Sequence, residues 1–188
     1  VARQTAHLSE ANRQLAQAAP IDHLTGMVVR SGFSEEAEME ISREYRSGRS
    51  FTLVLADVDN FKQFNDRHGH ACGDHVLRRV AQILRASVRD VDRVARWGGE
   101  EFILMLPETD DAGAAILAEK LRAAIEDNLF EFGGQALGIT MTLGIATHRR
   151  GESLEGTIAR ADTALYQGKQ EGRNKVMIGA YKGLTLVR

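Results

Sequence analysis

A pair of glycines followed by a pair of glutamates stands in the middle of the chain, at Gly98, Gly99, Glu100 and Glu101. Apolar runs flank this stretch on both sides, which is typical of a turn at the tip of a hairpin. Glycines adopt backbone angles closed to other residues and let a ligand approach the main chain, and adjacent carboxylates repel each other unless a cation lies between them. Taken alone, the stretch is explained more simply as a Gly-Gly turn with two solvated glutamates.

A second acidic motif favours a metal site. Asp57 and Asp59 end an apolar, β-branched run that begins at Phe51. Side chains two apart on a strand point to the same face, so both carboxylates are expected to face outward together. Mg²⁺ prefers oxygen ligands, usually one or two carboxylates with carbonyls, water and substrate phosphates. If this strand ends beside the hairpin tip, Asp57 and Glu100 would supply such a set.

Three cations accompany these acids: Lys62 soon after the strand, and Lys169 and Arg173 near the end of the last predicted helix. Cations beside a carboxylate–metal centre suit a polyphosphate substrate. Each one taken singly is more simply a solvated surface charge. Their joint occurrence with the acids favours a phosphate-binding site.

Asn65 and Asp74 form a candidate base-reading pair. An amide offers a donor and an acceptor, and a carboxylate accepts two hydrogens. Guanine presents N1–H and its 2-amino group side by side, which matches a carboxylate, whereas adenine offers no such pair. On local grounds, Asp74 as a helix N-cap and Asn65 as a turn residue are the simpler interpretations.

The elements that must position these residues alternate along the chain. Spacing and capping predict helices over about 31–46, 73–88, 110–125 and 153–169, and strands over 51–59, 93–97, 102–106, 137–147 and 175–178. Ser31, Asp110 or Asp111, and Ser153 are the expected N-caps. This order predicts an α/β (α+β) fold with a mixed, largely antiparallel sheet rather than a doubly wound parallel one.

The composition is that of an ordinary soluble domain. The 188 residues allow one domain with a full core and a short appendage, and a formal net charge of −2 gives no general basic field for nucleic acid. Cys72 is the only cysteine, so no internal disulfide can form, and a reducing, cytosolic location is expected. No run of about 18 apolar residues and no signal-peptide pattern is present.

Residues 1–19 carry Val1, Leu8 and Leu15 at heptad spacing, which predicts a helix ended by Pro20. Pairing with a second copy and packing on its own domain fit this short seam equally well. Because the chain begins at Val1, we expect it to be a fragment that lacks an upstream sensor, and membrane anchoring of the full-length protein stays open.

Five motifs in this order resemble the GGDEF-domain diguanylate cyclases, bacterial enzymes that condense two GTP molecules into cyclic di-GMP. The motifs are Asp22 to Gly26, Asp57 to Asp74, Arg96 to Phe102, Thr140 to Ala146, and Ala161 to Asn174. The resemblance covers residues 20–178, with glutamate at the third signature position (GGEEF), and leaves 179–188 as a C-terminal tail.

The resemblance implies a palm like that of class III nucleotidyl cyclases: a central, mostly antiparallel five-stranded sheet surrounded by helices, here with an N-terminal helical extension. It implies that Asp57, Glu100 and the Val58 carbonyl hold two Mg²⁺ or Mn²⁺ ions per active site. Glu100 would also accept the proton of the 3′-hydroxyl. The remaining signature residues assigned to substrate binding are Gly98, Gly99 and Glu101.

By the same resemblance, Lys62 is catalytic because it stabilises charge as pyrophosphate leaves, while Lys169 and Arg173 bind the outer phosphates. Retention of the family's guanine-reading carboxylate implies GTP rather than ATP. The implied positions around the guanosine are Asn65, His70 and Asp74.

Arg89 and Asp92 match the family's Arg-x-x-Asp inhibitory site. There they would bind the product cyclic di-GMP and hold the domains in an unproductive arrangement. Without the resemblance, a surface Arg–Asp pair of little energetic weight is the simpler interpretation. The spacing from Arg96 favours the inhibitory site.

The implied enzyme is a homodimer with one GTP per domain, because the product needs two 3′-hydroxyls that attack two α-phosphates. Two rival classes of function are a catalytically idle module that senses GTP or, through Arg89 and Asp92, cyclic di-GMP, and a partner-binding scaffold that uses the N-terminal helix. The intact Asp57, Lys62 and Glu100 favour the enzyme over the idle module.

Overall fold

A computed structural model describes residues 20–180. The expected N-terminal helix over 1–19 and residues 181–188 of the expected tail lie outside the described residues. Within 20–180, no helix is both long and apolar enough to cross a membrane.

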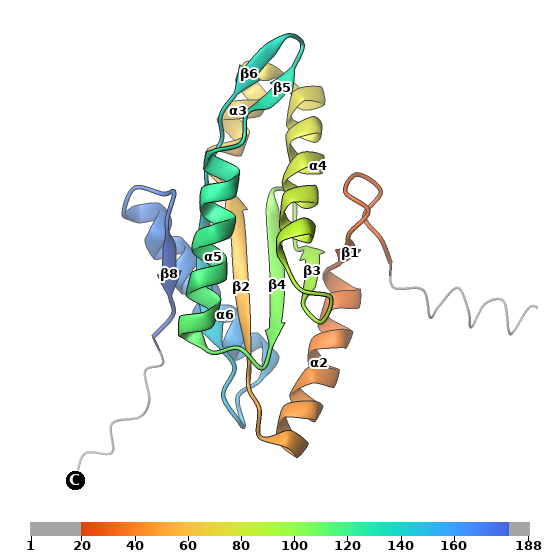
Figure 1. Cartoon of the computed structure of the whole chain (residues 1–188), viewed down its shortest axis with the longest axis vertical. Helices are drawn as coiled ribbons and strands as arrows, with labels where there is room; N and C mark the ends of the chain where they lie inside the picture. The colour runs from red at the N-terminus through yellow and green to blue at the C-terminus, as the bar shows by residue number, and fades with distance from the viewer. Residues whose placement is uncertain (1–19, 181–188) are drawn as a thin grey trace, which may run out of the picture.

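The described chain is organised around a six-stranded sheet (Figure 1). Its strands, in spatial order, are β1 (Val28–Val29), β3 (Arg93–Arg96), β4 (Glu101–Pro107), β2 (Phe51–Val58), β7 (Met141–Thr147) and β8 (Val176–Ile178). The three central pairings are antiparallel, while β1 with β3 and β7 with β8 are parallel. The mixed, mostly antiparallel sheet is confirmed, with one strand more than the five expected because the two-residue β1 joins its edge.

Helices cover both faces of the sheet. They are α2 (Arg30–Ser47), α3 (Phe61–His68), α4 (His70–Ser87), α5 (Asp111–Glu126) and α6 (Leu154–Gln170). Alternate residues of β2 pack with α4 and α5 on one side and with α2 and α6 on the other, so all eight of its residues are buried. A separate hairpin of β5 (Phe130–Phe132) and β6 (Gln135–Leu137) projects beyond the sheet near α3 (Figure 1).

Four local sequence predictions were wrong. Residues 61–68 form a helix that the short, polar pattern concealed, and Gly69, at φ 88°, separates it from α4. Asp74 therefore lies inside α4 and is not its N-cap. The strand expected over 137–147 is interrupted at 138–140, between the end of β6 and the start of β7. Ser31 is not a cap either, because α2 begins after Val29 without a side-chain cap.

The caps of α5 and α6 are confirmed. Asp110 accepts a hydrogen bond from the Gly113 N–H at 2.8 Å, and Ser153 accepts one from the Gly156 N–H at 3.1 Å. Both satisfy amide groups that a helix N-terminus otherwise leaves unpaired.

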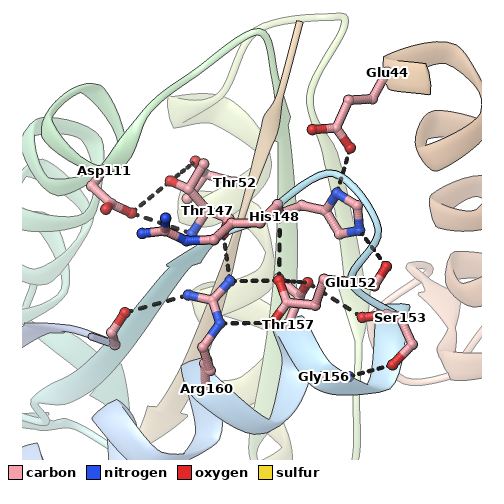
Figure 2. A network of polar contacts seen from close by, with 12 residues as sticks. Glu44, Thr52, Asp111, Thr147, His148, Glu152, Ser153, Gly156, Thr157 and Arg160 are labelled. Atoms are coloured by element: carbon pink, nitrogen blue, oxygen red, sulfur yellow. Dashed lines mark hydrogen bonds and ion pairs between the residues drawn. The ribbon is translucent and has the colours of Figure 1, made fainter. Parts of the chain in front are cut away.

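A buried polar network joins the helices at the end of the sheet where β2 begins (Figure 2). The His148 ring stacks on Phe51 with centroids 4.7 Å apart, and its Nδ1 contacts the Glu44 carboxylate. Its Nε2 lies 3.0 Å from the Glu152 carbonyl, which can only accept, so Nε2 carries a proton. His148 is 2% exposed, so α2, β7 and the start of α6 meet around one imidazole.

Removing either Glu44 or His148 leaves the polar group of the other residue buried without this partner. We expect Glu44→Ala to lower the free energy of unfolding by about 2–4 kcal/mol in urea titrations. Glu38→Ala, on an exposed site of the same helix, is the control and should change it by less than about 0.5 kcal/mol. Combined with His148→Ala, the two losses should not add, because each variant removes the same contact. Additive losses would show that Glu44 and His148 contribute independently.

Candidate active site

The acidic turn between β3 and β4 is held by backbone hydrogen bonds. The Trp97 N–H donates to the Glu101 carbonyl at 2.8 Å, and Gly98 and Glu101 exchange longer bonds of 3.3 Å. Neither glycine adopts a positive φ, so the expected need for unusual backbone angles was wrong. A side chain at position 98 would instead come within 3.3 Å of the Glu101 Oε2, and Gly99 faces open space. The glycines therefore leave room beside the carboxylates.

Arg96 stabilises this turn through hydrogen bonds. Its guanidinium donates to the Gly99 carbonyl at 2.7 Å and to both Asp22 carboxylate oxygens at 2.8 and 3.0 Å. Asp22 also accepts from the Thr25 N–H and hydroxyl. Burial alone would raise the pKa of Asp22, but the bonds from Thr25 and Arg96 hold it below its ordinary value. The Asp22–Thr25 spacing is typical of a side-chain-capped turn, and it is the sequence feature that could have indicated these contacts.

Strand pairing brings Asp57 to the turn. β2 and β4 pair with Asp57 opposite Glu101, and the Val58 N–H donates to the Glu100 carbonyl at 3.2 Å. The expected neighbourhood of Asp57 and Glu100 thus follows from the register of one antiparallel pair. Lys169, from the last turn of α6, places its Nζ 3.1 Å from the Asp57 carboxylate.

The electrostatics of Asp57 suit a cation. Burial raises the pKa of Asp57 to about 6, Lys169 opposes that shift, and the charges of Glu100 and Glu101 add to it. The Lys169 ammonium therefore offsets only part of the effect that burial has on the pKa of Asp57. Across residues 20–180, no three His, Cys, Asp or Glu side chains converge as a metal-ligand cluster. The donor set is two carboxylates and a strand-end carbonyl, which fits an ion that completes its shell with water and phosphate oxygens.

A cavity lies beside Asp57 and Glu100, and the expected phosphate-binding cations line it. It has a volume of about 280 Å³. Its lining includes Asp57, Val58, Asp59, Asn60, Phe61, Lys62, Gln63, Glu100, Lys169 and Arg173. Lys62 and Arg173 are exposed, whereas Lys169 is partly buried against Asp57. The fold thus gathers carboxylates and cations from three separate stretches of the chain, although their roles stay predictions.

Asp59 lines the same cavity as Asp57, but its carboxylate is held by different partners. Its carboxylate is 6% exposed and accepts hydrogen bonds from Thr140, Thr142 and the Asn174 amide. The expectation that both aspartates face outward together was wrong, because the chain leaves the strand after Val58. No sequence pattern indicated these three partners, which come from β7, the residue before it and the segment after α6.

The candidate guanine readers lie on two packed helices. Asn65 on α3 lies over Gly73 of α4, where an added Cβ would fall 1.8 Å from the amide Oδ1. That oxygen is buried without a hydrogen-bond partner. Asp74 and His70 are exposed on α4. A buried acceptor left without a partner is energetically costly.

Arg89 and Asp92 lie at the other end of β3 from the acidic turn. The Arg89 guanidinium donates to the buried Asp92 carboxylate at 2.7 Å and to the Thr109 hydroxyl at 3.0 Å. Arg89 and Asp92 thus form an ion pair with each other, and the Arg89 side chain is 58% exposed. Binding of a product there stays a prediction.

Comparisons with known proteins agree on one family. The family model described as "Diguanylate cyclase, GGDEF domain" matches residues 19–175. Diguanylate cyclase DgcP of Pseudomonas aeruginosa is 42% identical over 162 residues, which is 86% of this chain and 24% of DgcP. Diguanylate cyclase A of Treponema denticola is 34% identical, over 89% of this chain and 46% of that protein. The chain thus spans less than half of either relative.

Two solved structures are similar throughout the domain. The coiled coil and GGDEF domain of DgcB from Caulobacter crescentus, in complex with c-di-GMP, has a TM-score of 0.85 at 30% identity, covering 94% of each chain. Diguanylate cyclase SiaD from Pseudomonas aeruginosa, in complex with its activator SiaC, has a TM-score of 0.84 at 38% identity, covering 94% of this chain and 68% of SiaD.

Asp57→Asn tests the electrostatics of the site. The folded carboxyl, with its raised pKa, binds a proton more tightly than the unfolded one, so its ionisation between about pH 4 and 6 lowers stability. Without metal at pH 7.5, we expect the variant to be more stable by about 1–2 kcal/mol, and this gain should disappear towards pH 4.

Melting temperatures with and without Mg²⁺ provide the second measurement. Mg²⁺ should raise the melting temperature of the unaltered protein and of the control Asp66→Asn, which changes an exposed acid on α3. It should not raise that of Asp57→Asn. An equal Mg²⁺ effect in all three proteins would place the cation elsewhere.

Proposed function

Since this chain belongs to the GGDEF-domain family of diguanylate cyclases, we propose that it condenses two GTP molecules into cyclic di-GMP and two pyrophosphates. The observation that carries the proposal is the cavity at the acidic turn, where Asp57 and Glu100 meet three cations from separate stretches of the chain. A receptor for a neutral ligand has no use for that arrangement. A nucleoside triphosphate with bound divalent ions would match its charges.

In this proposal Asp57, Glu100 and the Val58 carbonyl hold two Mg²⁺ or Mn²⁺ ions. Such ions, when bound, acidify a hydroxyl and neutralise phosphate charge. Their binding would favour the ionised form of Asp57, whose pKa is raised mainly by burial and further by the charges of Glu100 and Glu101. The Lys169 ammonium would then be released from Asp57 towards the phosphates.

The protein groups divide the chemistry of each bond between them. The 3′-oxygen of one GTP attacks the α-phosphorus of the other, its proton passes to Glu100, and the bond to pyrophosphate breaks. Lys62 stabilises the charge that develops on the leaving pyrophosphate, while Lys169 and Arg173 hold the outer phosphates. Two such steps close the ring and release two pyrophosphates.

Guanine recognition is assigned to the two helices beside the cavity. The exposed Asp74 carboxylate accepts from N1–H and the 2-amino group, and Asn65 supplies the neighbouring amide. His70 lies at the start of α4, in the same substrate-binding segment. The glycines at 98 and 99 leave space for the substrate next to Glu101.

Two copies must cooperate, because one cavity holds one GTP and the product contains two guanylates. We therefore assign a homodimer in which the two substrates lie antiparallel. This arrangement uses only residues of the family motifs. Product inhibition through Arg89 and Asp92 completes the proposal. The DgcB structures in complex with c-di-GMP support a product-binding role in that relative, and here Arg89 would exchange its bond with Asp92 for the product phosphate.

The purified chain incubated with GTP and Mg²⁺ tests the activity. Cyclic di-GMP, identified by mass, should form with a more than linear dependence on protein concentration and slow as it accumulates. Glu100→Gln should lower the rate at least about 10²-fold with the fold retained, because the proton acceptor is lost. The control Glu131→Gln, exposed on β5, should keep the rate. Bound GTP without turnover at any concentration would instead favour the idle binding module.

A further inference from the structure

Asp59 is a buried carboxylate for which the proposed reaction has no direct use. Its Oδ2 accepts from the Thr140 hydroxyl at 2.7 Å and from the Asn174 N–H at 3.0 Å, and its Oδ1 accepts from the Thr142 hydroxyl at 2.6 Å. All three donors are uncharged groups. A buried carboxylate needs such hydrogen bonds, so we expect it to hold a particular part of the structure.

The loop that reaches Asp59 has an unusual backbone. Gly172, Arg173 and Asn174 have φ values of 106°, 64° and 49°, which places three successive residues in the left-handed region. For the two residues that carry side chains this conformation is uncommon and energetically unfavourable. The surrounding structure must therefore hold the loop in place.

Asn174 is fixed at both its main chain and its side chain. The N–H of Asn174 is shared between Asp59 and the Thr142 hydroxyl, the latter at 3.1 Å. Its Oδ1 accepts from Arg122 and its Nδ2 donates to Glu126, each at 2.7 Å. The loop thus connects the end of β2, strand β7 and helix α5.

The loop carries a cation of the cavity. Arg173 directly precedes Asn174 and lines the same cavity as Asp57 and Lys169. Its N–H donates to the Gly168 carbonyl at 2.9 Å, which ties it to the last turn of α6. Gly168 packs so closely on Thr142 that an added Cβ would lie 2.8 Å from the threonine methyl. The position of Arg173 therefore depends on the contacts that Asp59 organises.

We propose that Asp59 is a positioning residue: by holding the Asn174 amide, it maintains the left-handed loop that presents Arg173 to the outer phosphates of the substrate. The inference rests on the proposed function, because it assumes a triphosphate in this cavity. Asp59 contacts neither metal nor nucleotide in this role. It acts through Arg173.

Nucleotide binding in Ca²⁺, measured by calorimetry in the absence of turnover, tests the proposal. For Asp59→Ala we expect GTP affinity to fall about 10-fold and GMP affinity to change less than about 2-fold, since only the outer phosphates are affected. Asp59→Asn retains an oxygen for the Asn174 amide, so it should recover most of the GTP affinity. Asp127→Ala, at an exposed carboxylate beyond α5, is the control and should match the unaltered protein.

A double-mutant cycle separates positioning from general destabilisation. Arg173→Ala should also weaken GTP binding about 10-fold, and adding Asp59→Ala to it should cause little further loss. Losses that multiply to about 100-fold, or equal losses for GTP and GMP, would overturn the positioning role. If Asp59→Ala does not fold, Thr142→Val, which removes the hydroxyl that bonds both Asp59 and the Asn174 N–H, provides the same comparison.

The unaltered protein distinguishes the two levels of inference. If it binds GTP no better than GMP, the proposed function itself fails. If it prefers GTP and Asp59→Ala retains the full preference, only the role of Asp59 is overturned.

Discussion

The antiparallel pairing of β2 with its two neighbours is the constraint on which the site depends. Pairing with β4 sets Asp57 opposite Glu101 and beside Glu100, so that acids 43 residues or more apart in sequence share one end of the sheet. Pairing with β7 brings Thr140 and Thr142 to Asp59. A shift of one residue in either register would turn these side chains to the opposite face.

The two ends of the sheet handle buried charge in different ways. At the end where β2 begins, Glu44 and His148 satisfy each other within the protein, and Arg160 donates to the Thr147 carbonyl and pairs with Glu152 (Figure 2). At the other end, the charges of Glu100 and Glu101 add to the burial that raises the pKa of Asp57 to about 6, against the single opposing charge of Lys169. The first arrangement holds helices together. The second leaves negative charge for a ligand to neutralise.

The features that the sequence predicted correctly depend on local pattern. The apolar run ending at Asp57, the hairpin around Gly98 and Gly99, and the caps Asp110 and Ser153 can each be read within a few residues. The features that it missed depend on tertiary contacts. Gly69 separates two helices in a stretch where a turn was expected. The partners of Asp59 lie 81 or more residues away from it in sequence. Resemblance to a family predicted the site residues without explaining how they are held.

The most direct test of the account is a crystal structure with Mn²⁺ and a non-hydrolysable GTP analogue, using the anomalous signal of manganese. The account expects two manganese peaks between Asp57, Glu100 and the Val58 carbonyl, with Lys169 moved from Asp57 to the phosphates and the guanine beside Asn65 and Asp74. Nucleotide bound outside this cavity, or no manganese at these ligands, would contradict it.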